Sequence, residues 1–134
     1  MKGITYSFEK LNAWQESKKM VVAVYHLLDN FPKFEKFALC DQIRRAVVSI
    51  PSNIAEGCGR VSIREQIHFL EIAYGSLLET FNQLLIAIEL NYITEESVEE
   101  IKPTIDSVAK MINGLRNSNL KKLEEQTSTK QLNK

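Results

Sequence analysis

The sequence predicts an all-α fold, an antiparallel up-down four-helix bundle, on three observations. Apolar residues recur at alternating steps of three and four in four successive stretches, which is the period of a helix with one buried face. Only short polar segments separate these stretches, as antiparallel neighbours in a bundle require. The 5 Gly and 3 Pro among 134 residues leave little room for the turns of an all-β fold. The length suits a single domain, predicted at residues 1–124.

The first helix is predicted to begin near Asn12, because Asn12 and Gln15 have the spacing of a capping box. It ends before Pro32, since the residue that precedes a proline disfavours the α region. Its apolar stripe consists of Trp14, Val21, Val24, Leu28 and Phe31.

The second helix, predicted at about residues 37–58, contains Pro51 within its apolar pattern. A proline inside a helix removes one hydrogen bond and crowds the preceding turn, at a cost of ~3 kcal/mol. Either the helix bends there, or it breaks and Asn53 with Glu56 caps a second piece. The stripe continues across the proline, which favours a bend in which neighbouring polar side chains satisfy freed backbone groups, namely Ser49, Ser52 or Asn53. A glycine of Gly57-Cys58-Gly59 in the left-handed conformation is predicted to stop the helix.

The third helix begins after Ser62, which forms a capping box with Glu65, and should reach Leu90. Its coiled-coil seam consists of Ile63, Ile67, Leu70, Tyr74, Leu77, Phe81, Leu84 and Ile88. The fourth helix begins after Thr94 and contains Pro103, where a second kink is predicted. Its seam consists of Val98, Ile101, Ile105, Val108, Ile112 and Leu115. Residues 125–134 are polar and are predicted to form a disordered tail.

The charges cancel overall, with 17 basic and 17 acidic residues, so no global attraction to nucleic acid or membranes is expected. Residues 65–100 hold eight acidic residues and no Lys or Arg, which predicts an acidic side on the bundle. The first residues lack the apolar core of a signal peptide, and the longest apolar run, residues 84–88, is too short to span a bilayer. We therefore expect a cytoplasmic protein that does not enter the membrane.

No catalytic constellation is visible. Cys40 and Cys58 form neither a disulfide framework nor a zinc motif, and both are expected to be reduced structural residues. Glu65 and His68 have the Glu-x-x-His spacing of di-iron bundles, but this motif occurs once and points outward on the predicted heptad. The sequence therefore predicts a non-enzymatic protein with no metal, cofactor or small-molecule substrate.

Four arginines form the only concentrated basic set in the middle of the chain, and they are candidates for contacts with nucleic-acid phosphates: Arg44, Arg45, Arg60 and Arg64. Two alternatives compete with this interpretation. The arginines can pair within the chain with Asp41, Glu56 and Glu65, or they can pair between subunits with the acidic third helix. On the residues alone, the structural pairings are favoured.

Large apolar residues at outward positions of the third helix predict self-association. Ile72 and Ile86 lie at such positions, flanked by Phe69 and Leu90. Gly75 in mid-helix costs about 1 kcal/mol relative to alanine, and its small size lets another helix approach closely. The candidate oligomer interface is therefore Phe69, Ile72, Gly75 and Ile86.

Several short motifs carry a family resemblance. They are Leu11–Gln15 (LNAWQ), Phe31-Pro32, Gln42–Ala46 (QIRRA), Ser49–Gly57 (SIPSNIAEG), Arg60, and Ala73–Ser76 (AYGS) with Glu79. In this order, over residues 8–118, the chain resembles the four-helix-bundle proteins encoded in intervening sequences of bacterial 23S ribosomal RNA genes. The resemblance implies a homopentameric ring and kinship with accessory proteins of diversity-generating retroelements. It implies no catalytic residues.

Two functional hypotheses follow. In the first, the protein is an oligomeric binding or scaffold protein associated with ribosomal RNA or another nucleic acid through its arginines. In the second, the ring is a scaffold for a basic partner protein, such as a reverse transcriptase, and does not itself contact nucleic acid.

Overall fold

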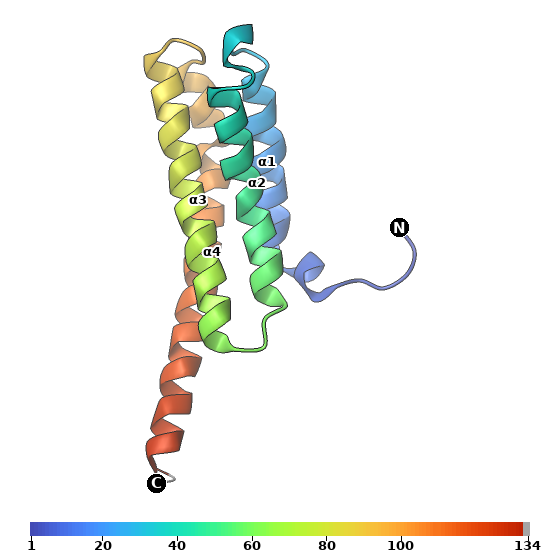
Figure 1. The fold of residues 1–134 in the computed structure, drawn as a ribbon, viewed down its shortest axis with the longest axis vertical. Helices are drawn as coiled ribbons and strands as arrows, with labels where there is room; N and C mark the ends of the chain where they lie inside the picture. The colour runs from blue at the N-terminus through green and yellow to red at the C-terminus, as the bar shows by residue number, and fades with distance from the viewer. Residues whose placement is uncertain (133–134) are drawn as a thin grey trace.

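The computed structural model describes residues 1–132, which form four α-helices and two short 3-10 segments. The elements are η1 (Ser7–Lys10), α1 (Asn12–Leu28), η2 (Lys33–Glu35), α2 (Leu39–Cys58), α3 (Ile63–Glu89) and α4 (Glu95–Leu132). Helices α1 and α3 each pack against both α2 and α4. Figure 1 shows the α1–α2 and α3–α4 connections at one end of the bundle and the α2–α3 connection at the other. The predicted all-α class and four-helix bundle are confirmed.

The core runs along the inner faces of all four helices. The largest apolar side chains that are almost wholly excluded from solvent are Met20, Val24, Ile43, Val47, Ile50, Ile54, Leu84, Val108 and Ile112. The predicted stripe of α1 is partly out of phase, because its buried face includes Ala13, Ser17 and Met20 while Trp14 is only half-buried. Ser17 tolerates burial because its hydroxyl donates to the Trp14 carbonyl oxygen at 2.7 Å.

The capping box predicted at Asn12 is wrong. Asn12 already lies in the first turn of α1, and the cap residue Leu11 has no side-chain cap bond. The Gln15 side chain instead donates to the Glu9 carbonyl oxygen in η1 at 2.9 Å. This bond ties the first turn of α1 to η1 and does not cap the first N–H groups of the helix.

Helix α2 is continuous through Pro51, which excludes the interpretation that it breaks there. Polar side chains beside the proline bond to the backbone of the preceding turn: Ser52 Oγ donates to the Val48 oxygen at 2.9 Å, and Asn53 Nδ2 to the Ser49 oxygen at 2.8 Å. Helix α4 likewise continues through Pro103. The bend predicted at each proline stays a prediction.

The left-handed glycine stop predicted for α2 is wrong. Gly57 is inside the helix, and Gly59 caps it with a φ of −86° in the right-handed region. A left-handed residue does end α3, where Asn91 has a φ of 62°. The starts predicted for α3 and α4 hold, and each has a side-chain cap: Ser62 Oγ accepts from the Glu65 N–H at 3.0 Å, and Thr94 Oγ1 from the Ser97 N–H at 3.1 Å.

The disordered tail expected from residue 125 differs from the structure, in which α4 continues to Leu132. Extending an existing helix costs far less than nucleating one, and Lys, Glu and Gln are good helix formers. The hydroxyls of Thr127 and Thr129 also bond to carbonyl oxygens four residues earlier. Residues 133–134 lie outside the described residues. Over the part of the chain that is described, no helix has both the length and the hydropathy to cross a membrane.

Candidate functional site

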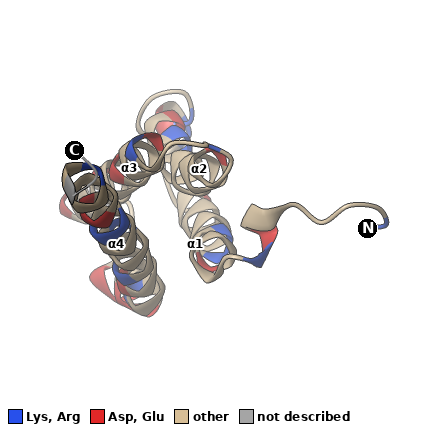
Figure 2. Ribbon diagram, turned by 90° about the horizontal axis from the view of Figure 1, so that it is seen from below, with Lys and Arg blue, Asp and Glu red and all other residues tan. Residues whose placement is uncertain are grey.

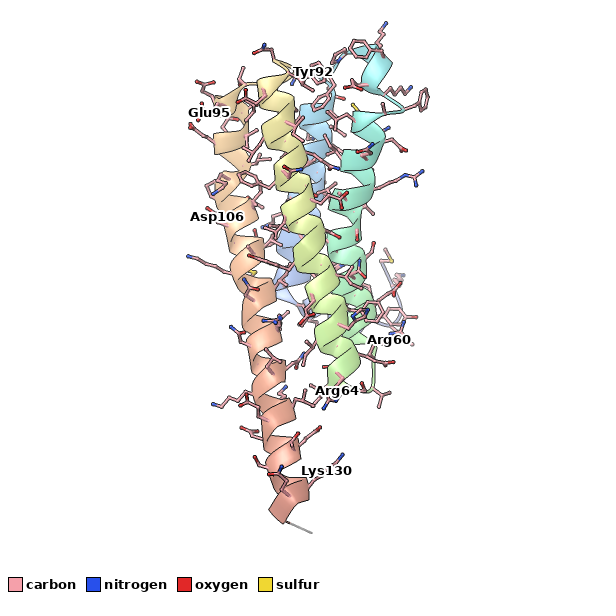
Figure 3. All side chains as sticks on the ribbon, turned by 60° about the vertical axis from the view of Figure 1, so that its left-hand side comes forward. Arg60, Arg64, Tyr92, Glu95, Asp106 and Lys130 are labelled. Atoms are coloured by element: carbon pink, nitrogen blue, oxygen red, sulfur yellow. The ribbon has the colours of Figure 1, made fainter. Side chains whose placement is uncertain are left out.

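The four candidate arginines do not form one surface. Arg44 and Arg45 lie in the second turn of α2, whereas Arg60 follows its end and Arg64 lies in the first turn of α3. The thirteen residues of helix from Arg45 to the end of α2 at Cys58 correspond to about 20 Å, so the two pairs lie toward opposite ends of α2. Figure 3 shows Arg60 and Arg64 together at the α2–α3 connection. Basic and acidic residues are distributed over all four helices, as Figure 2 shows.

Three of these arginines have partners within the chain, as the pairing hypothesis predicted. Arg44 Nη2 donates to the Lys36 carbonyl oxygen at 2.6 Å and lies 4.0 Å from Asp41. Arg45 Nε pairs with Asp41 at 3.2 Å. The Arg45 side chain nevertheless remains 80% exposed, so this pair is screened by water and contributes little stability.

At the α2–α3 connection, Arg60 makes both an ion pair and a cation–π contact. Its Nη2 lies 3.7 Å from Glu56, and its guanidinium lies over the Phe69 ring at 4.7 Å from the centroid. Arg64 is exposed and borders a hollow of about 270 Å³ together with Lys130. Of the four candidate arginines, Arg45 and Arg64 therefore remain most available to a partner, and Lys130 borders the same hollow as Arg64.

Three of the four residues predicted as an interface on α3 lie on its exposed side, and the fourth, Phe69, does not. Ile72 and Ile86 are exposed on the side of the helix away from its buried seam, and a Cβ added at Gly75 would meet no neighbouring atom within 4 Å. Phe69 does not belong to this exposed set, because its Cβ packs against Gly57 of α2 and the Arg60 guanidinium lies over its ring. Leu90, which the sequence placed beside this set, is exposed as well, and the structure adds Leu78 and Leu85.

We define the outward face of α3 as Ile72, Gly75, Leu78, Leu85, Ile86 and Leu90. Its five large side chains are between 38% and 51% exposed. Leu78 and Leu85 are spaced by one heptad, a signal that was present in the sequence but was hidden by the stronger seam beside them. Several exposed apolar side chains along one helix are a common mark of an interaction surface. Three of them, Leu85, Ile86 and Leu90, border one hollow.

The polar residues of the SIPSNIAEG and AYGS motifs contact one another between α2 and α3. Ser49 Oγ and Ser76 Oγ lie 2.9 Å apart, and Asn53 Nδ2 donates to Ser49 Oγ at 2.8 Å. Thr80 Oγ1 donates to the Ser76 carbonyl oxygen at 2.8 Å. These short side chains satisfy one another in a part-buried seam and fix the axial position of α3 on α2. Their role in this structure is therefore to position helices.

Neither the two thiols nor Glu65 and His68 lie in a cluster of catalytic or metal-binding side chains in the described part of the chain. Cys40 is buried, and burial raises the pKa of its thiol, which disfavours the nucleophilic thiolate. Cys58 is half-buried beside the Ser7 hydroxyl, at 3.4 Å. Glu65 and His68 are both exposed. Among residues 1–132, no group of three or more His, Cys, Asp or Glu side chains is placed to hold a metal ion.

Sequence reasoning missed a second exposed cluster beside η2. Phe34 and Phe37 are 76% and 84% exposed, and each directly follows a lysine, Lys33 and Lys36. The signal was the repeated Lys-Phe pair at a three-residue spacing. Helical periodicity does not detect this pair, because the segment connects two helices and has no helical period of its own.

The comparisons with known proteins agree with the motifs. The family model of the 23S rRNA-intervening sequence protein matches residues 9–114. A crystal structure of a protein with unknown function, from the S23 ribosomal protein family of Bacteroides thetaiotaomicron, is similar with a TM-score of 0.69. That protein is 28% identical, and the match covers 78% of this chain and 97% of that chain. No curated protein matches the chain. With a four-helix bundle, its motifs in the expected order and a family match over most of its length, this chain belongs to the 23S rRNA-intervening sequence protein family.

Proposed function

We propose that the protein is a non-enzymatic scaffold that assembles into a homo-oligomer through the outward face of α3. The observation that carries the proposal is that face itself, five large apolar side chains left exposed on a helix whose opposite side already fills the core. The family resemblance implies a ring of five copies, and a ring built in this way would offer many equal surfaces to a partner. The acidic character of residues 65–100 suits a basic partner protein.

Exposure of this kind is costly for a protein that stays monomeric. Burying an isoleucine or leucine side chain stabilises by about 1.5–3 kcal/mol, and half-exposed side chains recover part of that on association. Gly75 adds to the argument, because its missing side chain lets a helix of another copy approach the α3 backbone. The same glycine has no contact within its own chain that would require it.

The test is the mass of the protein in solution. Sedimentation velocity at micromolar concentration should give a homo-oligomer for the wild-type chain. The double variant Ile72→Glu/Ile86→Glu should raise the dissociation constant roughly 100-fold or more, because two desolvated charges replace two buried isoleucines. Circular dichroism should show that the helices of the variant remain intact.

A matched control is Val22→Glu, which places the same charge on an exposed apolar position of α1, at 57% exposure. It should leave the assembly unchanged. A wild-type protein that sediments as a monomer would contradict the proposal, and an Ile72→Glu/Ile86→Glu variant that assembles normally would move the interface away from this face.

A second candidate function is association with nucleic acid, favoured by the exposed Arg45 guanidinium and by the Arg64–Lys130 pair. Each phosphate neutralised by a cation releases counterions, so affinity should fall steeply as salt rises. Binding to a structured 23S ribosomal RNA fragment should weaken in Arg64→Glu/Lys130→Glu, and the slope of log affinity against log salt should lose about 2 units for two contacts. Lys18→Glu/Lys19→Glu supplies the same change of charge on α1 as a control. Absence of binding at low salt by assembled protein would remove this candidate.

A further inference from the structure

The segment between α1 and α2 presents two aromatic rings and two cations to solvent. We name Lys33, Phe34, Lys36 and Phe37 the basic knob. Both rings lie outside the core, at 76% and 84% exposure, which is unusual for phenylalanines in an ordered segment. The Lys36 ammonium lies 5.4 Å from the centroid of the Phe37 ring. The basic knob thus combines an apolar tip with positive charge.

The basic knob is held in place by the rest of the chain. Arg44 donates to the Lys36 carbonyl oxygen at 2.6 Å, and the Phe34 ring lies edge-on to Tyr92 with centroids 6.3 Å apart. Backbone bonds close two turns within the segment, from Glu35 N–H to the Pro32 oxygen and from Lys36 N–H to the Lys33 oxygen. A surface that is already ordered loses little conformational freedom when it binds. Arg44 therefore positions this surface.

The acidic member of the segment is turned toward the bundle. Glu35 is half-buried, whereas Lys33 and Lys36 on either side of it are exposed. Burial, followed by the nearby Glu35 carboxylate, raises the pKa of the Tyr92 hydroxyl, which places Glu35 on the Tyr92 side of the segment. The exposed part of the segment is consequently basic, although its sequence contains a glutamate.

A complementary surface lies at the same end of the bundle. Leu85, Ile86, Ile88, Glu89, Leu90 and Glu95 border a hollow of about 480 Å³, which we name the acidic hollow. Its lining is mostly apolar and includes two carboxylates, and Glu96, Glu99 and Glu100 are exposed farther along α4. Figure 3 shows Glu95 on the α4 side of this end, while the segment that follows α1 lies on the other side of Tyr92.

We propose that the basic knob of one copy seats in the acidic hollow of a neighbouring copy. The phenylalanine rings would cover Leu85, Ile86 and Leu90, and Lys33 and Lys36 would face Glu89 and Glu95. This inference rests on the proposed homo-oligomer and names its contact. The acidic hollow includes three residues of the outward face of α3, so both proposals describe one continuous interface.

The arrangement of the two surfaces also sets the symmetry. The basic knob and the acidic hollow are different patches, so a contact between them is head-to-tail. A contact of this kind forms a closed ring when the rotation between copies closes. Both patches lie at the same end of the bundle, so neighbouring copies would stand side by side with their helices pointing the same way (Figure 1).

A second copy fits this surface better than single-stranded nucleic acid does. Stacking of bases on aromatic rings needs a groove of positive charge that follows the backbone. Here the exposed Asp29 lies beside Lys33 and Lys36, and Asp41 pairs with Arg44 and Arg45. The acidic hollow supplies complementary charge within the same chain. The two possibilities separate cleanly in the experiment.

The experiment is a charge swap followed by sedimentation. Lys33→Glu/Lys36→Glu reverses the basic knob, and Glu89→Lys/Glu95→Lys reverses the acidic hollow. Each should raise the dissociation constant between copies at least about 100-fold. The fourfold variant that carries both changes restores opposite charges across the contact, and its dissociation constant should return to within about tenfold of the wild-type value. Lys121→Glu/Lys122→Glu makes the same change in net charge on α4, away from both patches, and should assemble normally.

Each alternative outcome has a defined meaning. Reversed variants that assemble like the wild-type chain would overturn the contact while leaving the outward face of α3 in place as the interface. Loss in both double variants without recovery in the fourfold variant would also overturn it. Normal assembly of Lys33→Glu/Lys36→Glu with lost binding of a labelled oligouridine would assign the basic knob to nucleic acid. A monomeric wild-type protein would instead refute the proposed homo-oligomer itself.

Discussion

Leu84→Ala should lower the free energy of unfolding of the bundle by about 2–5 kcal/mol. Leu84 is 0% exposed and belongs to the core cluster, so its truncation removes buried apolar surface and leaves a cavity that the packed helices fill only in part. Urea denaturation followed by circular dichroism, at the lowest workable protein concentration, measures this loss within the subunit.

The neighbouring residue provides the matched control. Leu85 is 45% exposed on the outward face of α3, so Leu85→Ala should cost the isolated subunit less than about 1 kcal/mol. Its effect should fall on the dissociation constant between copies instead. Equal losses of subunit stability in the two variants would contradict the division of α3 into a core side and an interface side.

Gly57→Val should destabilise the bundle by about 3 kcal/mol, because α2 and α3 approach closely at this glycine. A Cβ at residue 57 would lie 2.9 Å from the Phe69 Cβ, and that atom is fixed to the α3 backbone and cannot swing aside. Relief requires the two helices to separate, which would also strain the part-buried contact between Ser49 and Ser76. Thermal unfolding of the two proteins at equal concentration measures the difference.

Gly114→Ala is the control of opposite sign. Gly114 lies within α4, and a Cβ there would meet no atom within 4 Å. The substitution should stabilise the helix by about 1 kcal/mol through propensity alone. If Gly57→Val proved as harmless as Gly114→Ala, the close approach of α2 to α3 would not be the reason for a glycine at position 57.

The sequence predicted best where one signal was repeated many times. The seam of α3 has eight members at helical spacing, and the core residues Ile67, Leu70, Leu77 and Leu84 follow it. The phase of α1 was harder to predict, because a local hydrogen bond lets Ser17 be buried and because Trp14 lies at the edge of the core, edge-on to Phe8 of η1. A periodic pattern of apolar residues predicts which apolar side chains are buried. It does not predict the burial of a serine whose hydroxyl is hydrogen-bonded to the backbone.

The candidate site was predicted in part for the same reason. Pairing of the arginines with Asp41 and Glu56 was visible, because partners four residues apart meet on a helix. The bond from Arg44 to the Lys36 backbone and the packing of Phe69 on Gly57 were not visible, since each depends on how separate segments meet in space. Exposure of Phe34 and Phe37 likewise follows from the path of a connection that has no period of its own.

The length of α4 gives the molecule a direction. The helix has 38 residues and so extends about 57 Å from Glu95, beside the acidic hollow, to the far end of the bundle, where it projects beyond α2 and α3 (Figure 1). Copies that stand side by side in one orientation would therefore expose two unlike rims, one made of connecting segments and one of projecting polar helices. A partner that binds one rim would contact the same end of every copy. A label fused after α4 would mark the rim of projecting helices and would leave the contact between copies undisturbed.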